Sequence, residues 1–425
     1  MLKCSNAKMS ERGFAALFIT LLVLLIMSGI AISLATITLG QERVSRNITK
    51  STQSYYLAEA GIEDIILRLS KNMKWSSPYN IDLAGGQTAI TTSDIIGGSR
   101  TITSTGNFFN RVRKIQVVYK ISAQGASFYY GAQVGDGGMT MGNGSAVQGN
   151  VFSNGSVTGG GRIANNITVA HNGNKIEGIT VDDNATVHTC KNSTIGGTLT
   201  YVSGGSAQDC NAGGGTVVQP NEIPPENLPI PLSQINDWKS NAAAGGIINN
   251  DVSYSGIAAA GPIQIGAPSS PKNLTVENKA ALTIKGTIYV TGNIIFENNA
   301  TVQLDGSYGS FSGVIIADGK ITTNNGVALN GSGQVGSYIL VLSTNNSLNP
   351  SSPAINVGNN AVGAIYYTTS GLIYLKNNML AREITGYKVQ IENNAVIQYE
   401  SGLQSATFSS GPGGSWEVAS WKEIE

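Results

Sequence analysis

The chain has few charged side chains, and their signs balance. Only 12% of its 425 residues are charged, 26 basic against 26 acidic, and there are two histidines. Proteins that bind nucleic acid through its phosphates, or that are held by an anionic membrane surface, need a surplus of Lys and Arg. The composition therefore gives no basis for either interaction, and we expect no nucleic-acid partner.

Cysteine is also scarce, with only Cys4, Cys190 and Cys210. An odd number outside the cytoplasm would leave one thiol unpaired. Cys190 and Cys210 enclose about 20 residues, a loop whose closure contributes roughly 3 kcal/mol. A Cys190–Cys210 disulfide in an oxidising compartment is the preferred interpretation, and two free or buried thiols are the alternative.

Charge is absent altogether from one long apolar run, Phe14 to Leu39. Roughly 26 residues of helix reach about 39 Å, enough to cross a hydrocarbon core about 30 Å thick. A secretory signal has an apolar stretch of only about 7–15 residues. The small-x-small triplet Ser33-Leu34-Ala35 lies too deep in the run to be its cleavage site. The run therefore predicts a transmembrane helix.

Patterns typical of an α-helix continue beyond this run. Asp64 and Arg68 stand four residues apart in the favourable order for an ion pair, and Pro78 closes the region. Apolar residues recur on one helical face at Ala58, Ile62, Ile65 and Leu69. We predict one long helix over residues 14–72.

The stretches "RGFAALFITLLVLLIMSGIAI" and "YYLAEAGIEDIILRL" resemble the N-terminal region of type IV pilin-like proteins and of fimbrial-biogenesis minor pilins. The resemblance covers roughly the first 70 residues. It implies that residues 1–13 are a cytoplasmic leader, that a prepilin peptidase cuts between Gly13 and Phe14, and that the new amino terminus is methylated. It also implies packing against other pilin-like subunits, an inner-membrane location with most of the chain extracytoplasmic, and loss of Cys4 with the leader.

The sequence departs from the family at one position. Major pilins carry a glutamate at the fifth mature position, which pairs with a neighbour's amino terminus, and here that position is Phe18. The departure favours a minor, tip or membrane-resident role over bulk polymerisation. An ordinary uncleaved anchor is the alternative.

Residues 73–125 are predicted to form a small antiparallel β domain. "SRTITSTGNFFNRVRKIQVVYKIS" alternates on both sides of Gly106-Asn107, which indicates a hairpin. Arg111, Arg113 and Lys114 form a basic cluster that is better explained as the solvated face of one strand than as a binding patch.

An internal repeat begins near Ala126. An Asn-rich phrase followed by small and β-branched residues recurs, for example as "SNGSVTGG", "ENNATVQL", "GNNAVGAI" and "ENNAVIQY". A constant phrase at irregular spacing predicts a parallel β-solenoid, with Asn at left-handed corners and in stacked ladders, and with apolar residues filling the column. An antiparallel sandwich is the competing architecture.

A Pro-rich excursion with a short helix, residues 216–250, is predicted to split the solenoid into 126–215 and 251–410. Ser233 is the expected N-cap, Gly245 ends the helix, and Ile235 and Trp238 share its apolar face. The tail, residues 411–425, places Trp416 and Trp421 near the end, where we expect a cap over the last coil.

Residues suited to catalysis are sparse. Glycoside cleavage needs two carboxylates about 5–9.5 Å apart, whereas adjacent residues such as Asp182 and Asp183 point to opposite faces of a strand. His171 and His188 are separated by about one coil length, so they could share a face beside Cys190 and bind a metal ion. The favoured interpretation is that both are solvated residues at corners of the coils. Ordinary turn chemistry better explains the isolated acids Asp136, Asp209, Asp305 and Asp318. We predict no cofactor and no metal site.

Tyr366 and Tyr367 are adjacent, so on a strand one points inward and one outward. The outward ring is the candidate contact for a glycan or cell surface, although filling a gap between coils is the favoured role. Together these features predict a non-enzymatic, membrane-anchored pilin-like protein with a structural or adhesive solenoid. A membrane-tethered polysaccharide lyase or glycosidase is the alternative.

Overall fold

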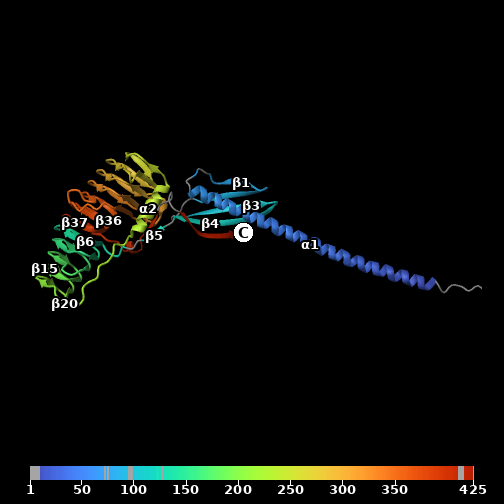
Figure 1. Ribbon diagram of the computed structural model, residues 1–425, viewed down its shortest axis with the longest axis horizontal. Coiled ribbons are helices and arrows are strands. Elements are labelled where there is room, and N and C mark those ends of the chain that lie inside the picture. Colours follow the sequence, from blue (N-terminus) through green and yellow to red (C-terminus); the bar gives the residue numbers. More distant parts are fainter. Residues whose placement is uncertain are drawn as a thin grey trace, which may run out of the picture.

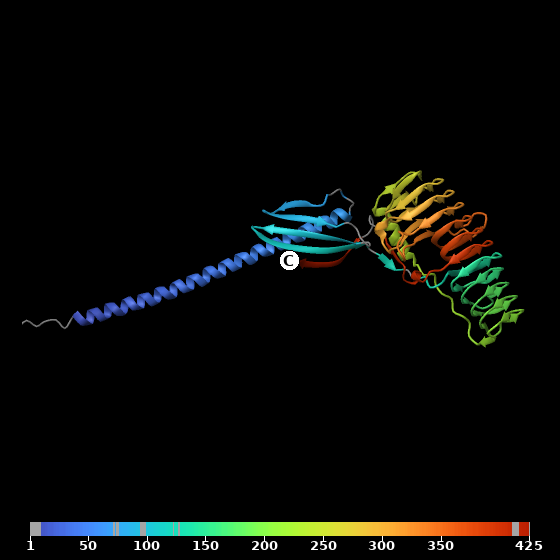
Figure 2. The same ribbon diagram turned by 180° about the vertical axis from the view of Figure 1, so that it is seen from behind.

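The computed structural model describes residues 10–70, 73, 76–93, 99–121, 123–125, 128–409 and 416–424. A long helix, a small antiparallel sheet and a large, mostly parallel β-solenoid lie one after another in an extended molecule (Figure 1, Figure 2). This is the fold class that the sequence predicts.

Helix α1 (Ser10–Ser70) is 61 residues long. The end nearer Ser70 packs on the small sheet through Ala58, Ile62 and Ile65, which are fully buried. Arg68 Nε donates to Asp64 Oδ2 at 2.6 Å, so the predicted apolar stripe and ion pair are both confirmed.

The small sheet contains β1 (Tyr79–Leu83), β2 (Gly86–Thr92), β3 (Ser99–Phe108) and β4 (Arg111–Ile121), each antiparallel to the next. The predicted hairpin is confirmed, but its turn is Phe109-Asn110, at φ 46° and 61°. Gly106 lies inside β3, where a Cβ would stand 2.1 Å from the carbonyl oxygen of Ser54. The glycine is therefore needed for close approach of α1, not for a turn.

The C-terminal residues form strand β40 (Trp416–Ile424) and not the predicted cap over the last coil. It pairs antiparallel with β4 and completes the five-stranded sheet. The chain can return there because it enters and leaves the solenoid through one paired ribbon, β5 (Ala123–Gly125) with β39 (Thr407–Ser409). Pairing also satisfies the backbone groups along the edge of β4. The solenoid is thus an insertion between β4 and β40.

The solenoid strands are short, and most pair in parallel with the strand three positions further along the chain, as β26–β29 and β29–β32 do. The first section contains β6 (Ala132–Met141), β7 (Ala146–Gln148), β8 (Val151–Ser153), β9 (Val157–Gly159), β10 (Arg162–Ile163), β11 (Ile167–Val169), β12 (Lys175–Glu177), β13 (Thr180–Val181), β14 (Ala185–Val187), β15 (Thr189–Lys191), β16 (Thr194–Ile195), β17 (Leu199–Val202), β18 (Ala207–Gln208), β19 (Asn211–Ala212) and β20 (Thr216–Gln219). The second section contains β21 (Ile247–Ile248), β22 (Val252–Tyr254), β23 (Ile257–Ala260), β24 (Ile263–Ala267), β25 (Ser270–Pro271), β26 (Leu274–Val276), β27 (Ala281–Ile284), β28 (Ile288–Val290), β29 (Ile294–Phe296), β30 (Thr301–Leu304), β31 (Gly313–Ala317), β32 (Ile321–Thr323), β33 (Ala328–Asn330), β34 (Ile339–Ser343), β35 (Ile355–Val357), β36 (Val362–Leu375), β37 (Leu380–Ile391) and β38 (Val396–Gln398), with 3₁₀ turns at Gly306–Tyr308 and Ser401–Ser405.

The two sections stack in the reverse of their chain order. Strand β37 pairs in parallel with β6, and β38 pairs with β7, so the last coil of the second section lies against the first coil of the first section. The stack therefore runs from β21 to β38 and then from β6 to β20. The segment after β20 returns along the whole stack to reach α2 and β21 (Figure 1).

Asparagines hold the corners of the coils, as predicted. Oδ1 of Asn273 accepts from the backbone N–H of Asn293 at 2.8 Å, and Asn293 Oδ1 accepts from Lys320 N at 2.8 Å. Left-handed backbone recurs at a second corner, at Asn299, Asn360, Asn378 and Asn394. Apolar side chains pointing inward form one continuous core.

Helix α2 (Leu232–Ala244) covers one outer face of the solenoid. Its N-cap is Pro231 rather than the predicted Ser233. Pro231 has extended backbone, with φ −72° and ψ 154°, and makes no side-chain cap hydrogen bond. Gly245 ends the helix as predicted. Ile235 and Trp238 are buried in a second core that includes strand residues such as Val314, Ile316, Leu340, Leu342 and Ile365.

Candidate functional site

The first half of α1 lies outside both cores. Leu17, Leu24 and Leu34 expose 63%, 68% and 59% of their surface, and the apolar segment has a mean hydropathy of 2.7 in its most apolar window. By length and composition this helix can cross a membrane. A large exposed apolar surface of this kind marks contact with lipid or with another protein.

Four hydroxyl side chains inside the apolar half, those of Thr20, Ser28, Thr36 and Thr38, hydrogen-bond to their own helix. Thr20 Oγ1 donates to the Leu17 carbonyl at 2.9 Å, and Ser28 Oγ donates to the Leu25 carbonyl at 2.8 Å. Because these hydroxyls already have acceptors, burying them in lipid or between helices leaves no unpaired donor.

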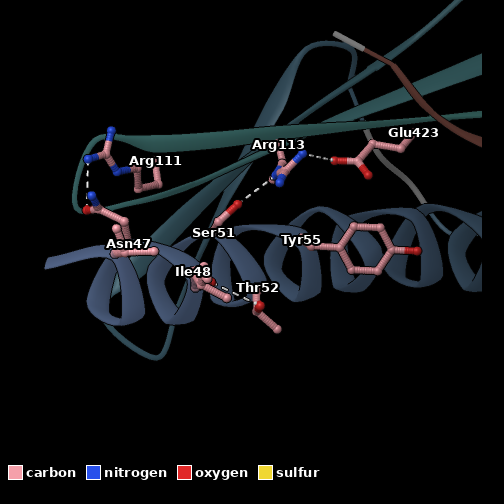
Figure 3. A pocket seen from close by; sticks show the side chains of 9 residues that line it. Asn47, Ile48, Ser51, Thr52, Tyr55, Arg111, Arg113 and Glu423 are labelled. Carbon is pink, nitrogen blue, oxygen red and sulfur yellow. Dashed lines mark hydrogen bonds and ion pairs between the residues drawn. The ribbon is translucent and has the colours of Figure 1, made fainter. Parts of the chain in front are cut away.

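A groove of about 590 Å³ begins where α1 meets the sheet (Figure 3). One wall is α1, and the other is formed by the start of β4 and the end of β40. We call it the α1 groove. Its lining comprises Val44, Asn47, Ile48, Ser51, Thr52, Tyr55, Arg111, Arg113 and Glu423.

Three hydrogen bonds fix the polar wall of the α1 groove (Figure 3). Arg111 Nη2 donates to Asn47 Oδ1 at 2.9 Å, and Arg113 Nε donates to Ser51 Oγ at 2.7 Å. Arg113 Nη1 also pairs with Glu423 Oε1 at 2.9 Å. Two guanidiniums against one carboxylate leave this wall with one positive charge in excess.

The floor of the groove is apolar and open. Val44 and Ile48 expose 58% and 61% of their surface one helical turn apart. An apolar helix face beside ordered arginines is suited to receive a second helix, with an acidic group opposite the excess charge. These are features of surfaces that bind other proteins.

The sequence predicts only part of this site. Arg111 and Arg113 are solvent-exposed, as expected, but their hydrogen-bond partners Asn47 and Ser51 lie 64 and 62 residues away along the chain. Glu423 lies 310 residues from Arg113. The available signal was the helical spacing of Val44, Ile48, Ser51 and Tyr55, which marks a second stripe on α1.

The processing and disulfide residues were predicted from the sequence. Gly13 and Phe14 lie within α1, and Phe14 exposes 73% of its surface. Cleavage between them stays a prediction. The disulfide between Cys190 and Cys210 is present, with the two Cα atoms 6.2 Å apart.

The predicted tyrosine contact is wrong. Tyr366 and Tyr367 do point to opposite sides of β36, but both are fully buried. Tyr366 belongs to the inner core, and Tyr367 belongs to the core under α2. The Tyr367 hydroxyl donates to the carbonyl oxygen of Ile230 at 3.0 Å, so the Pro-rich excursion covers the ring that was expected to be exposed.

Asp182, Asp305, His171 and His188 each have a different partner. Asp182 accepts from Arg162 Nε at 2.9 Å, and the Asp305 carboxylate accepts from Ser307 N at 3.0 Å as the cap of a 3₁₀ turn. His171 and His188 each face a different carboxylate, Asp136 at 3.6 Å and Glu222 at 3.5 Å. Within the part of the chain that the structure describes, no group of three or more His, Cys, Asp or Glu could hold a metal ion.

Helix α1 thus combines one exposed apolar half with one half packed on a small sheet. Residues 12–63 match the model of the family described as PilX N-terminal. The N-terminal segment is therefore similar to this pilus-related family, which confirms the resemblance seen in the sequence. The family match covers this segment and not the solenoid.

Two solved structures are similar to larger parts of the chain. The competence-associated pilin ComZ from Thermus thermophilus is 10% identical, with 88% of this chain and 98% of that chain covered and a TM-score of 0.26. An ice binding protein from an Antarctic Flavobacteriaceae bacterium is 12% identical, with coverages of 63% and 80% and a TM-score of 0.17. These scores are too low to show a shared fold. No curated protein matches the chain in sequence.

Proposed function

We propose that the chain is a non-enzymatic, minor pilin-like subunit of a type IV pilus or related secretion assembly. The observation that carries the proposal is the division of α1 into an exposed apolar half and a half packed on the sheet. The match over residues 12–63 supports it. Phe18, in place of a charged residue, favours a minor position over a repeating one.

In this proposal the apolar half of α1 first anchors the protein in the inner membrane as a single span, with the solenoid outside the cytoplasm. A prepilin peptidase then cuts between Gly13 and Phe14. The α1 groove receives the helix of a neighbouring pilin-like subunit, so that the solenoid projects from the assembly as a structural or adhesive head. Its insertion between β4 and β40 supports this arrangement, because both connections leave the sheet on one side.

The first test is processing. The protein extracted from membranes should begin at an N-methylated Phe14, and Gly13→Val should retain the leader. Gly29→Val is the matched control, because Gly29 lies in the same helix with open space around it. An intact Met1 in the wild type would leave a simple membrane anchor.

The second test is assembly. Ile48→Asp places a charge on the floor of the α1 groove, and we expect it to abolish cross-linking to co-expressed pilin-like subunits. Ile257→Asp, at a solenoid position that is 93% exposed, should have no effect. Equal cross-linking by both variants would show that the groove is not the interface.

A further inference from the structure

A second groove, of about 500 Å³, lies on the solenoid far from α1. It forms where the loop at residues 331–337, between β33 and β34, rises beside the outer surface of the stacked coils. We call it the solenoid groove. Its lining includes Gln303, Asn330, Val335, Tyr338, Arg382 and Glu400.

The loop that walls the solenoid groove is held in one shape by its own hydrogen bonds. Ser337 Oγ accepts from Ser332 N at 2.9 Å and donates to the Phe311 carbonyl at 2.7 Å. The N–H of Ser337 donates to the Gln334 carbonyl at 3.2 Å. Val335 at the tip is nonetheless 95% exposed. A rigid loop presenting an apolar side chain loses little entropy when a ligand binds against it.

The polar end of the groove is an ordered pair that stays accessible. Arg382 Nη1 and Glu400 Oε1 are 2.7 Å apart, and the Tyr338 hydroxyl donates to Glu400 Oε2 at 2.6 Å. The Arg382 and Glu400 side chains remain 30% and 40% exposed. Guanidinium donors and carboxylate lone pairs are left over for a ligand. Because the two charges cancel, a ligand with hydroxyl groups suits this end better than an ion.

A ladder of mostly aliphatic side chains, called the aliphatic ladder, runs beside the groove over successive coils. β-Strand registry places its members side by side, at Thr301, Ala328, Val362, Leu380, Val396 and Ala146. All of them point away from the core and are exposed or half-buried. On the neighbouring face of the same coils the outward positions are polar, at Thr322, Asn356, Tyr374 and Gln390. The apolar stripe is therefore particular to this face.

A polar ladder lies parallel to the aliphatic one, two residues further along each strand. Gln303 is the register partner of Asn330, and Gln398 is the register partner of Gln148. All four side chains are exposed. Arg382 lies between them and donates to Gln398 Oε1 at 3.3 Å. Amides that both donate and accept, repeated at about 4.8 Å per coil, match hydroxyl groups repeated along a polymer.

We propose that the solenoid groove and its two ladders bind a neutral polysaccharide, which lies across the coils. The apolar faces of its sugar rings rest on Val362, Leu380 and Val396. Ring hydroxyls on one edge bind the amides and the Arg382–Glu400 pair. The proposal assigns a class of ligand to the solenoid head. It rests on the proposed function in one respect, that the assembly carries the solenoid outward.

The test uses the full chain in detergent and affinity electrophoresis through gels containing dextran, a β-1,4-glucan or a galactomannan, with alginate as the anionic contrast. We expect at least one neutral polymer to retard the wild type. Val335→Asp should weaken binding by about tenfold or more, because the contact would have to desolvate a charge. Gln303→Ala should weaken it several-fold. Both positions are exposed, so the fold is unaffected.

Gln208→Ala is the matched control and should bind as the wild type does. Gln208 is an exposed glutamine on the neighbouring face of the stack, in register with Lys191. The proposal is overturned if no neutral polymer retards the wild type, if only alginate does, or if all three variants behave alike. The assay involves neither the Gly13 cleavage nor the α1 groove. A negative result here therefore leaves the pilin-like role standing, and an uncleaved N-terminus leaves the glycan site standing.

Discussion

Ile384 in β37 and Ala132 in β6 are register partners in adjacent parallel strands, although the chain traverses most of the solenoid between them. This pairing joins the last coil of the second section to the first coil of the first. Both side chains are fully buried in the one continuous core. The two sections therefore form one uninterrupted stack, with no gap where the chain enters and leaves the solenoid.

Ile384→Ala should destabilise the solenoid by about 2–5 kcal/mol, since it leaves a cavity in the joint between sections. Denaturant unfolding followed by the fluorescence of buried Trp238 would measure the loss. Ile257→Ala is the control, because that side chain is 93% exposed and its truncation should change stability by less than about 0.5 kcal/mol. Equal midpoints for the two variants would contradict the uninterrupted stack.

Tyr367→Phe should lower the free energy of unfolding by about 0.5–1.5 kcal/mol, because it removes the hydrogen bond to the Ile230 carbonyl and leaves that acceptor unpaired. The loss should also appear locally, as faster proteolysis of the Pro-rich segment before α2. Tyr374→Phe is a suitable comparison, since Tyr374 lies on the same strand and is only half-buried. Unchanged proteolysis would mean that the hydroxyl does not hold the excursion in place.

Replacing Cys190 and Cys210 together by alanine should lower the free energy of unfolding by about 2–4 kcal/mol, because the unfolded chain regains the entropy of the closed loop. The wild type with its leader removed should show no titratable thiol when denatured without reductant. Two thiols per chain under those conditions would rule out the disulfide in the native protein.

The free energy of unfolding should decrease as the pH rises, because of one buried acid, Glu383. Burial raises the pKa of its carboxyl well above the usual range, and the Thr385 hydroxyl donates to it at 2.5 Å. The folded protein keeps this proton to a higher pH than the unfolded chain does. The stabilisation is therefore complete below the unfolded-state pKa of about 4.3 and is lost as the pH rises through the folded-state pKa.

Glu383→Gln should remove this pH dependence, because the amide stays neutral at every pH. Denaturant midpoints measured from about pH 4 to pH 8 would show a flatter curve for the variant than for the wild type. Glu63→Gln, at an exposed position on α1, should keep the wild-type slope. A wild-type slope in Glu383→Gln would mean that another group is responsible.

Local chemistry along the sequence was enough to predict the elements. The run from Phe14 to Leu39 predicts a membrane-spanning helix, because its length and lack of charge are properties of the segment alone. Asn-rich corners followed by β-branched residues likewise determine the coils, since left-handed backbone and alternating side chains are local preferences. Cys190 and Cys210 could be paired because few cysteines were available.

Only the tertiary structure decided how these elements meet. The reversed stacking of the solenoid depends on β37 meeting β6, and the fifth strand of the sheet depends on β40 returning to β4. Parallel coils of similar sequence can pair in more than one order, so local preference does not choose among them. The burial of Tyr367 also depends on tertiary structure, because an outward ring is exposed or buried according to which distant segment covers it.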